Sequence, residues 1–597
     1  MASSQASNEG NATPTESYSH DVEKGGFDQT VERYDTRATT EEPFHFSIGK
    51  WLALSGLLLG FISDVYSQVL VQNSMTYLNA KLGPTNEYPW VGQMAIFTAT
   101  VPAPVIGYLS DIYGRRNFIL AGSVLAFIGL IVSANVSTIP RLYGACAITG
   151  MGAAMHQLAI PALSEMVPRH SRPFAIGSFA AALAPAAAFG PVTAASILIH
   201  YDWTVIFWIP FAINILAFIL TFLFYHPMNQ YVRYEGRKAS QQLLNLDWTA
   251  AVLVVMGACL ALLGVTFGLF QYPWDDPKTL GTLISGLCMV IGTIPYGFIM
   301  RNKLTFAMFP STVFAQYRQF TTFLFPILFC ALVFNTTSVV WPQQVHLLYT
   351  QDSIIAGWYT SAAPLAGIFF SPLYGLIFQK FARFSRWILT FLVFTLTLLS
   401  ACQATLSPTK SSGSLAIVCL MGIVYSGIVV GMTSYMQLVP HRWLGTAFQF
   451  DVFLRVIGSS AAGFAYSVIL TNKLTELLPT DVAVPLAEAG VDPTVIPQVI
   501  QALMAGITTS PALAALKPEQ IGLAVMGLQK AFISSFRIIY YATIALGVPC
   551  IAFVALSKSF DNLLTGEVDV KLVEGLRINP ETDTGDGPVV AAGGPWL

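Results

Sequence analysis

Two ionisable side chains, Asp64 and His156, lie inside long apolar segments, where a charged group is costly and is a candidate for function by default. Carboxyl and imidazole groups take up and release protons when their surroundings are suitable. Asp64 and His156 are therefore candidates for coupling proton movement to another process. The alternatives are a structural acid for Asp64 and a packed, hydrogen-bonded histidine for His156.

A second candidate site lies at 335–346, near the end of another apolar segment. Polar and aromatic side chains gather there, as in pockets for amphipathic ligands: Asn335, Trp341, Gln343, Gln344 and His346. Arg455 is a further candidate for the ligand pathway, although its spacing of four from Asp451 on one helix face favours a structural ion pair. For Trp341 the alternative is a place in an aromatic belt at a membrane surface.

The segments that hold these residues are long enough to cross a lipid bilayer. Of the 597 residues, 54% are hydrophobic and only 10% are charged, against about 25% charged in a soluble protein. Fourteen segments have about the 20 apolar residues that a spanning helix needs: 50–73, 89–109, 117–135, 141–163, 174–199, 204–225, 248–270, 279–300, 320–341, 354–378, 386–406, 414–437, 445–471 and 530–556. Helices satisfy their own backbone in lipid, and the short alternating segments of a β-barrel are not seen. The sequence thus predicts an all-α integral membrane protein with 14 transmembrane helices.

Lys and Arg residues are unevenly divided between the connecting loops, and such residues favour the cytoplasmic side. With the N-terminus inside, 14 of them lie in cytoplasmic loops and six in the opposite loops. We therefore expect both termini in the cytoplasm. The long connection from Thr471 to Lys530 then lies outside and holds amphipathic pieces broken by prolines. A packed surface loop is preferred there to a lid over the outer mouth.

The segment GYLSDIYGRR, which begins at Gly107, joins the second and third apolar segments. Gly107 lets helices approach closely, Asp111 can pair with a basic residue or a helix N-terminus, and Gly114 permits a tight turn. Arg115 and Arg116 hold the loop inside. The segment resembles the signature loop of the major facilitator superfamily, and the resemblance implies a gating loop that closes the cytoplasmic side. A charge cluster that only sets topology is the alternative.

A weaker copy of this loop, with Gly375 and Arg383, follows later in the chain, where Gln379 stands in place of the acid. Such a repeat is expected of transporters whose two halves rock about a central site. The resemblance implies the major facilitator fold with two six-helix halves and two extra helices. The chain is then divided into a disordered cytoplasmic tail (1–46), an N-terminal half (47–226), a linker with the extra helices (227–305), a C-terminal half with an external loop at 472–529 (306–556), and a cytoplasmic tail (557–597).

The fifth apolar segment is rich in alanine and contains Pro185 and Pro191. Together with Gly177 and Gly190 they resemble the antiporter motif of the same superfamily. Small residues there allow close helix packing, and proline weakens the helix. Three positions of the motif have alanine instead of glycine: Ala186, Ala194 and Ala195. The motif favours export, and a well-packed helix of small residues is the alternative.

A narrower resemblance, over about residues 45–560, is to the fungal trichothecene efflux pump family within the 14-span drug:proton antiporter branch. It rests on AITGMGAAMHQLAIPALSEMVP, DWTVIFWIPFAINI and HRWLGTAFQFDVFLRVIGSSAAG. One departure is Cys146, which stands where drug antiporters usually carry an arginine; His156 is its candidate substitute. The resemblance implies proton-coupled efflux of a small hydrophobic or amphipathic compound (a toxin, secondary metabolite or drug) by alternating access. Siderophore transporters share this architecture, so proton-coupled uptake of a ferric siderophore is the competing hypothesis.

Other classes of protein are disfavoured by what the sequence lacks. It has no P-loop for ATP coupling and no metalloprotease or hydrolase motif, which disfavours an enzyme. The seven cysteines lack paired spacing and predict free thiols, with no metal site. A net charge of −2 gives no basic field for nucleic acid. We expect a monomer in the plasma membrane, or alternatively in a vacuolar or vesicle membrane, that needs no cofactor and binds protons and a small-molecule substrate.

Overall fold

The computed structural model describes residues 47–83, 85, 88–227, 246–270, 272–300, 308, 320–350, 352–405, 411–439, 443–492, 495–504, 516–561 and 564. The regular secondary structure of these residues is helical, which confirms the all-α prediction. The expected N-terminal tail, most of the linker before the extra helices and most of the C-terminal tail lie outside the described residues.

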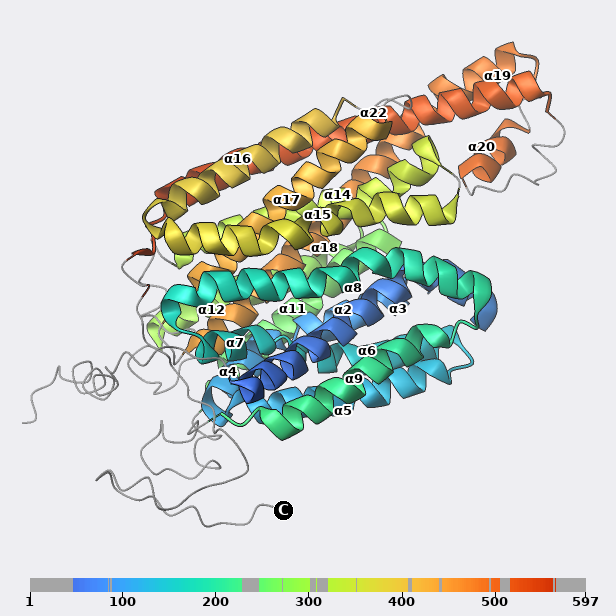
Figure 1. Ribbon diagram of the computed structural model, residues 1–597. Helices are drawn as coiled ribbons and strands as arrows, with labels where there is room; N and C mark the ends of the chain where they lie inside the picture. The colour runs from blue at the N-terminus through green and yellow to red at the C-terminus, as the bar shows by residue number, and fades with distance from the viewer. Residues whose placement is uncertain are drawn as a thin grey trace, which may run out of the picture. The chain divides into compact units, whose positions relative to one another are not determined.

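Six helical segments form the N-terminal half (Figure 1). They are α2 (Ile48–Leu82), α3 (Pro89–Thr100) with α4 (Ala103–Tyr113), α5 (Arg115–Ala134), α6 (Ile139–His156) with α7 (Ala159–Met166), α8 (Arg172–His200) and α9 (Val205–Phe224). The second segment is interrupted next to Pro102, which has no backbone N–H to continue a helix. The fourth segment is interrupted directly after His156, so this side chain lies at a helix end in the interior of the half.

Eight further long helices follow in the second part of the chain. They are α11 (Trp248–Phe270), α12 (Pro277–Ile299), α14 (Thr321–Gln344), α15 (Ser353–Lys380), α16 (Ser385–Gln403), α17 (Ser411–Met436), α18 (Leu444–Leu478) and α22 (Pro518–Leu556). The first two match the predicted extra helices, and the other six match the predicted C-terminal half. Residues 46–597 form one compact unit.

Twelve helical segments within the described residues are long and apolar enough to cross a membrane. They correspond to 12 of the predicted spans. The other two predicted spans coincide with α14 and α18, which are helices of 24 and 35 residues. The membrane-spanning architecture is therefore confirmed, while the count of 14 crossings stays a prediction.

The most extensive contacts between the halves run along two helix pairs, and smaller contacts join α8 to α17 and α18 to α3 and α7. The helix α8 packs along α15, and Figure 1 shows the two side by side; α4 packs against α18. The extra helices α11 and α12 pack on each other, and α11 also contacts α4 and α18. The ends of α4 and α7 and the start of α18 lie at one end of the bundle, which we call the latch end.

The predicted external loop at 472–529 is largely helical where it is described. The helix α18 continues to Leu478 and into a π-helical turn (Pro479–Ala483), followed by α19 (Val484–Glu488) and α20 (Ile496–Met504); α22 begins at Pro518. Apolar side chains of these pieces are buried in one cluster with Leu528 and Phe532 of α22: Val482, Leu486 and Val499. This segment lies at the end of α18 opposite the latch end, and its packing agrees with the preferred packed loop.

Candidate functional site

Asp64 on α2 and His156 at the end of α6 are in direct contact. The Oδ2 atom of Asp64 lies 2.6 Å from Nδ1 of His156, and the residues are 2% and 1% exposed. Next to this pair, α5 and α6 pack closely at a glycine, because a Cβ atom at Gly122 would lie 2.8 Å from Cβ of Met155. The two separately predicted proton-coupling candidates therefore form one buried acid–base pair.

The second nitrogen of His156 is also hydrogen-bonded. Its Nε2 atom lies 2.8 Å from the Ser123 hydroxyl oxygen on α5. The imidazole thus bridges Asp64 and Ser123, so both ring nitrogens have a partner in either tautomer. In contrast, Oδ1 of Asp64 has no hydrogen-bond partner among the described residues.

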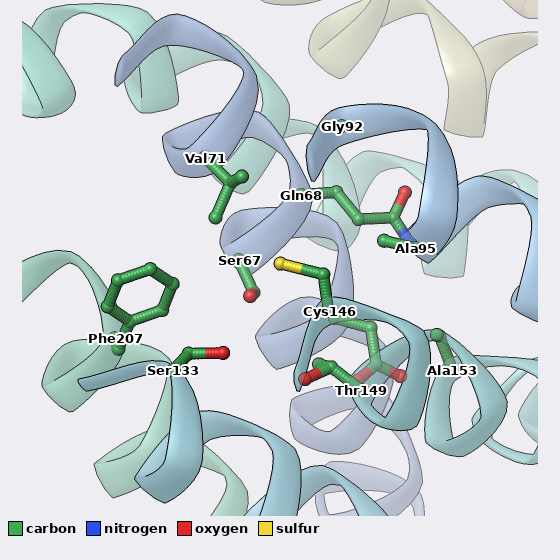
Figure 2. Close-up of a pocket in the computed structure, with 12 residues that line it drawn as sticks. Ser67, Gln68, Val71, Gly92, Ala95, Ser133, Cys146, Thr149, Ala153 and Phe207 are labelled. Carbon is green, nitrogen blue, oxygen red and sulfur yellow. The ribbon is translucent and has the colours of Figure 1, made fainter. Parts of the chain in front are cut away.

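A small cavity of about 20 Å³, with room for about one water molecule, adjoins Asp64 (Figure 2). Its walls include the side chains of Ser67, Ser133 and Cys146. The sequence comparison with drug antiporters singled out Cys146 as the position that usually carries arginine. The structure places that position at the cavity next to Asp64, with the Cys146 thiol hydrogen-bonded to Ser133.

The second buried acid–base pair lies in the C-terminal half and is fully satisfied. Asp451 and Arg455 form the predicted ion pair on α18. A second guanidinium hydrogen bond, of 2.6 Å, goes to the Thr433 hydroxyl on α17. Asp451 is completely buried, whereas the side chain of Arg455 is 22% exposed. The pair therefore ties α17 to α18, and a role of Arg455 in the substrate pathway stays a prediction.

The loop that begins at Gly107 joins the two halves. Asp111 accepts hydrogen bonds from the backbone N–H groups of Gly445 (2.9 Å) and Thr446 (2.8 Å), at the N-terminus of α18. A helix N-terminus favours a carboxylate because its N–H groups are unsatisfied and its dipole is positive there. A Cβ atom at Gly107 would lie 2.7 Å from the Gly445 carbonyl oxygen, and Gly114 has φ +89°. The predicted close approach, turn and helix-terminus contact are all confirmed, and we call this contact the latch.

Two arginines surround the latch on its N-terminal side. Arg115 is buried and pairs with Asp111 at 3.1 Å and with Glu165 of α7 at 2.9 Å. Arg116 donates to the Phe222 carbonyl at the end of α9 and lies 3.0 Å from Nε2 of His226. Arg115 therefore holds the latch acid in place, whereas Arg116 binds α5 to α9.

The weaker copy of the loop makes a different contact. A Cβ atom at Gly375 would lie 2.6 Å from the Pro173 carbonyl oxygen of α8, so close packing between α15 and α8 is preserved. Arg383 is exposed. The charge contact on this side comes from Arg172, which donates to the Gln437 carbonyl beyond the C-terminus of α17 at 2.7 Å. A cation at a helix C-terminus is favourable for the same reason as an anion at an N-terminus.

The antiporter-like helix α8 is a packing surface along its whole length. A Cβ atom at Gly177 would clash with the Ser371 carbonyl of α15, and one at Gly190 would clash with Val69 of α2. Pro185 and Pro191 lie inside α8, which runs unbroken past both. The small residues therefore do allow close packing against neighbours in both halves, as predicted.

The candidates at 335–346 are distributed over several environments. Trp341 is buried and donates from its indole nitrogen to the Tyr359 carbonyl at 2.8 Å, which fixes α14 to α15. Gln343 is exposed, and Gln344 is buried and donates to the Tyr540 hydroxyl. The side chains of Asn335 and His346 lie outside what the structure describes. Trp341, Gln343 and Gln344 thus lie in three different surroundings. Their role in substrate binding stays a prediction.

Sequence reasoning missed Ser123, Glu165 and Arg172. Ser123 is a small polar residue in an apolar helix and carries no pattern of its own. Glu165 lies two residues beyond the predicted fourth span (141–163), so the sequence did not mark it as an acid inside the membrane. Arg172 was counted only as a loop charge.

Comparisons with known proteins agree with this architecture. A model of the family described as fungal trichothecene efflux pump (TRI12) matches residues 63–595. The trichothecene efflux pump TRI12 of Trichoderma arundinaceum is 25% identical over 522 residues, which cover 83% of this chain and 84% of that protein. Multidrug resistance protein 3 of Bacillus subtilis is 25% identical over 71% of this chain and 80% of that protein. A solved peptide transporter, POT in complex with sulfate, shares the fold with a TM-score of 0.51 at 13% identity, over 85% of this chain and 96% of that chain.

The family model covers nearly the whole chain. The chain therefore belongs to the fungal trichothecene efflux pump family and is an efflux transporter of the major facilitator superfamily.

Proposed function

We propose that this transporter exports its substrate in exchange for protons, with Asp64 and His156 as the proton-binding pair. The contact of 2.6 Å between these two buried side chains is the observation that carries the proposal. Both groups can bind and release protons, and Oδ1 of Asp64 is still available. The pair of Asp451 with Arg455 is less suited, because arginine does not give up its proton in proteins.

A short path connects the proton-binding pair to the latch. The Gln449 side chain of α18 donates to the Ala154 carbonyl of α6 at 2.9 Å, two residues before His156. Gln449 lies about one turn from Thr446, which binds Asp111. A change in the charge of the Asp64–His156 pair therefore acts on a helix that directly contacts the latch helix. This supports the proposal that proton binding and latch opening are linked.

The proposed orientation follows from the Lys and Arg residues, which place the latch end and both termini in the cytoplasm. The latched structure is then closed toward the cytoplasm by Asp111 and Arg172. In the cycle, a proton from outside binds Oδ1 of Asp64 as the substrate leaves, and the loss of the carboxylate charge weakens its attraction to a protonated His156. Opening of the latch then exposes the pair to the cytoplasm, where the proton is released and the next substrate binds.

A proton gradient provides enough energy for such export. One charge that crosses a potential of about 100 mV supplies about 2.3 kcal/mol. This corresponds to roughly fiftyfold accumulation, at about 1.4 kcal/mol per tenfold. We propose a small hydrophobic or amphipathic substrate such as a toxin, secondary metabolite or drug. The relatives named trichothecene efflux pumps make a trichothecene the first compound to test.

Transport in liposomes tests the proposal. The purified protein is reconstituted in both orientations, and uptake of a labelled trichothecene is measured with the interior acidic. We expect uptake to need the pH gradient, and Asp64→Asn to remove this dependence while exchange of labelled for unlabelled substrate continues. Asp202→Asn, an exposed acid between α8 and α9, is the control and should transport normally. Uptake that continues after a protonophore collapses the gradient would contradict proton coupling.

Growth experiments separate the proposal from its competitor. We propose the plasma membrane as the site of action and a monomer as the working unit. A strain that overproduces the protein should resist added toxin, and a deletion strain should be sensitive. Restoration of growth in low iron by an added ferric siderophore, only in the strain that carries the protein, would instead support uptake.

A further inference from the structure

Ser123 of α5 contacts the imidazole nitrogen of His156 that Asp64 does not. Its hydroxyl oxygen lies 2.8 Å from Nε2 of the imidazole and 3.3 Å from the carbonyl oxygen of Ile119, four residues earlier in α5. Ser123 and His156 are both buried. The hydroxyl therefore has two acceptors within reach inside the bundle, the imidazole nitrogen and the backbone carbonyl.

The position of Ser123 is set by the packing of α5 against α6 and α9. A Cβ atom at Gly122 would lie 2.9 Å from the Gly152 carbonyl oxygen, and one at Gly152 would lie 2.7 Å from the Gly122 carbonyl oxygen. The backbones of α5 and α6 therefore meet directly beside Ser123. From α9, the buried amide of Asn214 donates to the Ser123 carbonyl at 3.4 Å. Together these contacts hold the Ser123 hydroxyl against the imidazole.

The two acceptors match the two charge states of the imidazole. A serine hydroxyl donates one proton and accepts through its oxygen, whereas a carbonyl only accepts. When His156 is neutral and Nδ1–H donates to Asp64, Nε2 has no proton and accepts from the Ser123 hydroxyl. When His156 is charged, Nε2–H donates to the Ser123 oxygen, and the hydroxyl donates to the Ile119 carbonyl instead. Rotation of one O–H group thus gives Nε2 a hydrogen bond in both states.

We infer that Ser123 is a positioning residue of the proton-binding pair: its hydroxyl turns between Ile119 and His156, so that the imidazole can gain or lose a proton without leaving a buried polar atom unpaired. In the proposed cycle, a proton on Asp64 removes the charge that balances a protonated His156. The N–H bond at Nε2 then breaks, the proton leaves for the solution, and the electron pair stays on the nitrogen and accepts from Ser123. Binding of a proton is the reverse. This inference rests on the proposed function and adds a third residue to the pair.

Transport by variants at position 123 tests this role in the same liposomes. Ser123→Ala removes the hydroxyl and Ser123→Thr keeps it. Ser74→Ala is the matched control, because the buried Ser74 hydroxyl of α2 also donates to the carbonyl four residues earlier. We expect Ser123→Ala to lower gradient-driven uptake about fivefold or more, the effect of one unpaired buried polar atom, while exchange of labelled for unlabelled substrate stays near the wild-type rate. Ser123→Thr and Ser74→Ala should retain both activities.

The outcomes separate this inference from the proposed function. An equal fall of uptake and exchange in Ser123→Ala would mean that the residue only supports packing, and normal gradient-driven uptake would mean that the hydroxyl is not needed; either result overturns the inference. A Ser123→Thr variant that exchanges substrate normally but does not respond to the gradient also overturns it. In these cases the pair of Asp64 and His156 stands if Asp64→Asn abolishes gradient dependence. If Asp64→Asn retains gradient dependence, the proposed function itself fails.

Nuclear magnetic resonance of the imidazole tests the contact without transport. The whole protein is prepared with isotope-labelled histidine, and the signals of His156 are identified by their loss in His156→Gln. We expect Ser123→Ala to shift the Nε2 signal of His156, because this nitrogen loses its hydrogen-bond partner, and Ser74→Ala to leave the signal in place. An Nε2 signal that is the same in Ser123→Ala and wild type would overturn the inference.

Discussion

Thr446 of α18 donates two hydrogen bonds of 2.8 Å, from its backbone N–H and its hydroxyl, to one carboxylate oxygen of Asp111, which lies 335 positions earlier in the chain. The other oxygen of Asp111 accepts from Gly445 and lies 3.1 Å from Arg115. Both carboxylate oxygens are thus occupied, one of them by the opposite half alone. A separation of the two halves at the latch end would have to break these bonds, so we expect the carboxylate charge to stabilise the latched arrangement.

Asp111→Asn is expected to favour the open state. An amide keeps one acceptor oxygen but loses the charge that the N-terminus of α18 and Arg115 stabilise. A loss of about 1–2 kcal/mol is reasonable for such an interaction, which would shift the ratio of open to closed molecules by about five- to thirtyfold. Distances between spin labels at Asn117 and Arg383, two exposed positions at the latch end in opposite halves, measure this shift. The control is Asp202→Asn, and an unchanged distance distribution in Asp111→Asn would contradict the role of the latch.

Gly177→Ala is expected to destabilise the protein and slow transport. The added Cβ atom meets the Ser371 carbonyl of α15, which belongs to the backbone and cannot move aside easily. Overpacking of this kind costs about 1–3 kcal/mol. Gly144→Ala on α6 is the matched control, since its Cβ atom would meet nothing within 4 Å, and alanine favours a helix slightly over glycine. Thermal unfolding in detergent should show a lower midpoint for Gly177→Ala alone; equal midpoints would mean that the α8–α15 contact is more tolerant than its geometry indicates.

His226 gives the latch end a pH dependence. Burial, and then the nearby Arg116 guanidinium, lower the pKa of His226 below its ordinary value. The folded protein therefore favours the neutral imidazole, whose nitrogen can accept from Arg116. The stability that this contact provides is complete above the ordinary histidine pKa of about 6.5 and is lost as the pH falls through the lowered value. His226→Gln should show a smaller fall in the unfolding midpoint than wild type between about pH 7.5 and 5.5, and an identical fall in both would show that His226 contributes nothing.

Local physics made the latch predictable from sequence. Gly107, Asp111 and Gly114 lie within one short segment. The first lets two helices approach closely, the second supplies a negative charge, and the third adopts a positive φ in the turn. The sequence also indicated a helix N-terminus or a basic residue as the partner of Asp111, and the structure contains both. The spans were predictable for the same reason, because 20 apolar residues in lipid have to form a helix.

The contact between Asp64 and His156 was not predictable. The two residues are 92 positions apart, and their meeting depends on how α2 and α6 rotate about their axes when they pack. Gly122 of α5 packs closely against α6 next to His156, yet glycine is common in membrane helices and does not mark such a contact in advance. The role of Trp341 was not predictable either. An aromatic residue near a helix end is equally consistent with an aromatic belt at the membrane surface, a binding site or a packing contact, and the structure shows a hydrogen bond to the Tyr359 carbonyl.

Cys146→Arg restores the residue type that drug antiporters usually carry here, and it is expected to impair rather than improve proton coupling in this protein. Cys146 and Asp64 line the same small cavity, and Oδ1 of Asp64 has no hydrogen-bond partner among the described residues, so we expect a guanidinium at position 146 to interact with the carboxylate that would bind the proton. A permanent cation there stabilises the carboxylate and so opposes the binding of a proton. Gradient-driven uptake should fall at least tenfold, while Cys146→Ser, which introduces a small uncharged side chain, should stay within twofold of wild type.

The combination of Cys146→Arg with His156→Gln tests this explanation further. If the arginine replaces the histidine as the basic partner of Asp64, the double variant should recover more gradient-driven uptake than either single variant. If His156 is required whatever occupies position 146, the double variant should be no more active than the lower of the two. Recovery would mean that the pair of Asp64 and His156 is an alternative form of an acid–arginine pair; no recovery would mean that the proton has to move through the imidazole, whose two nitrogens already join Asp64 to Ser123.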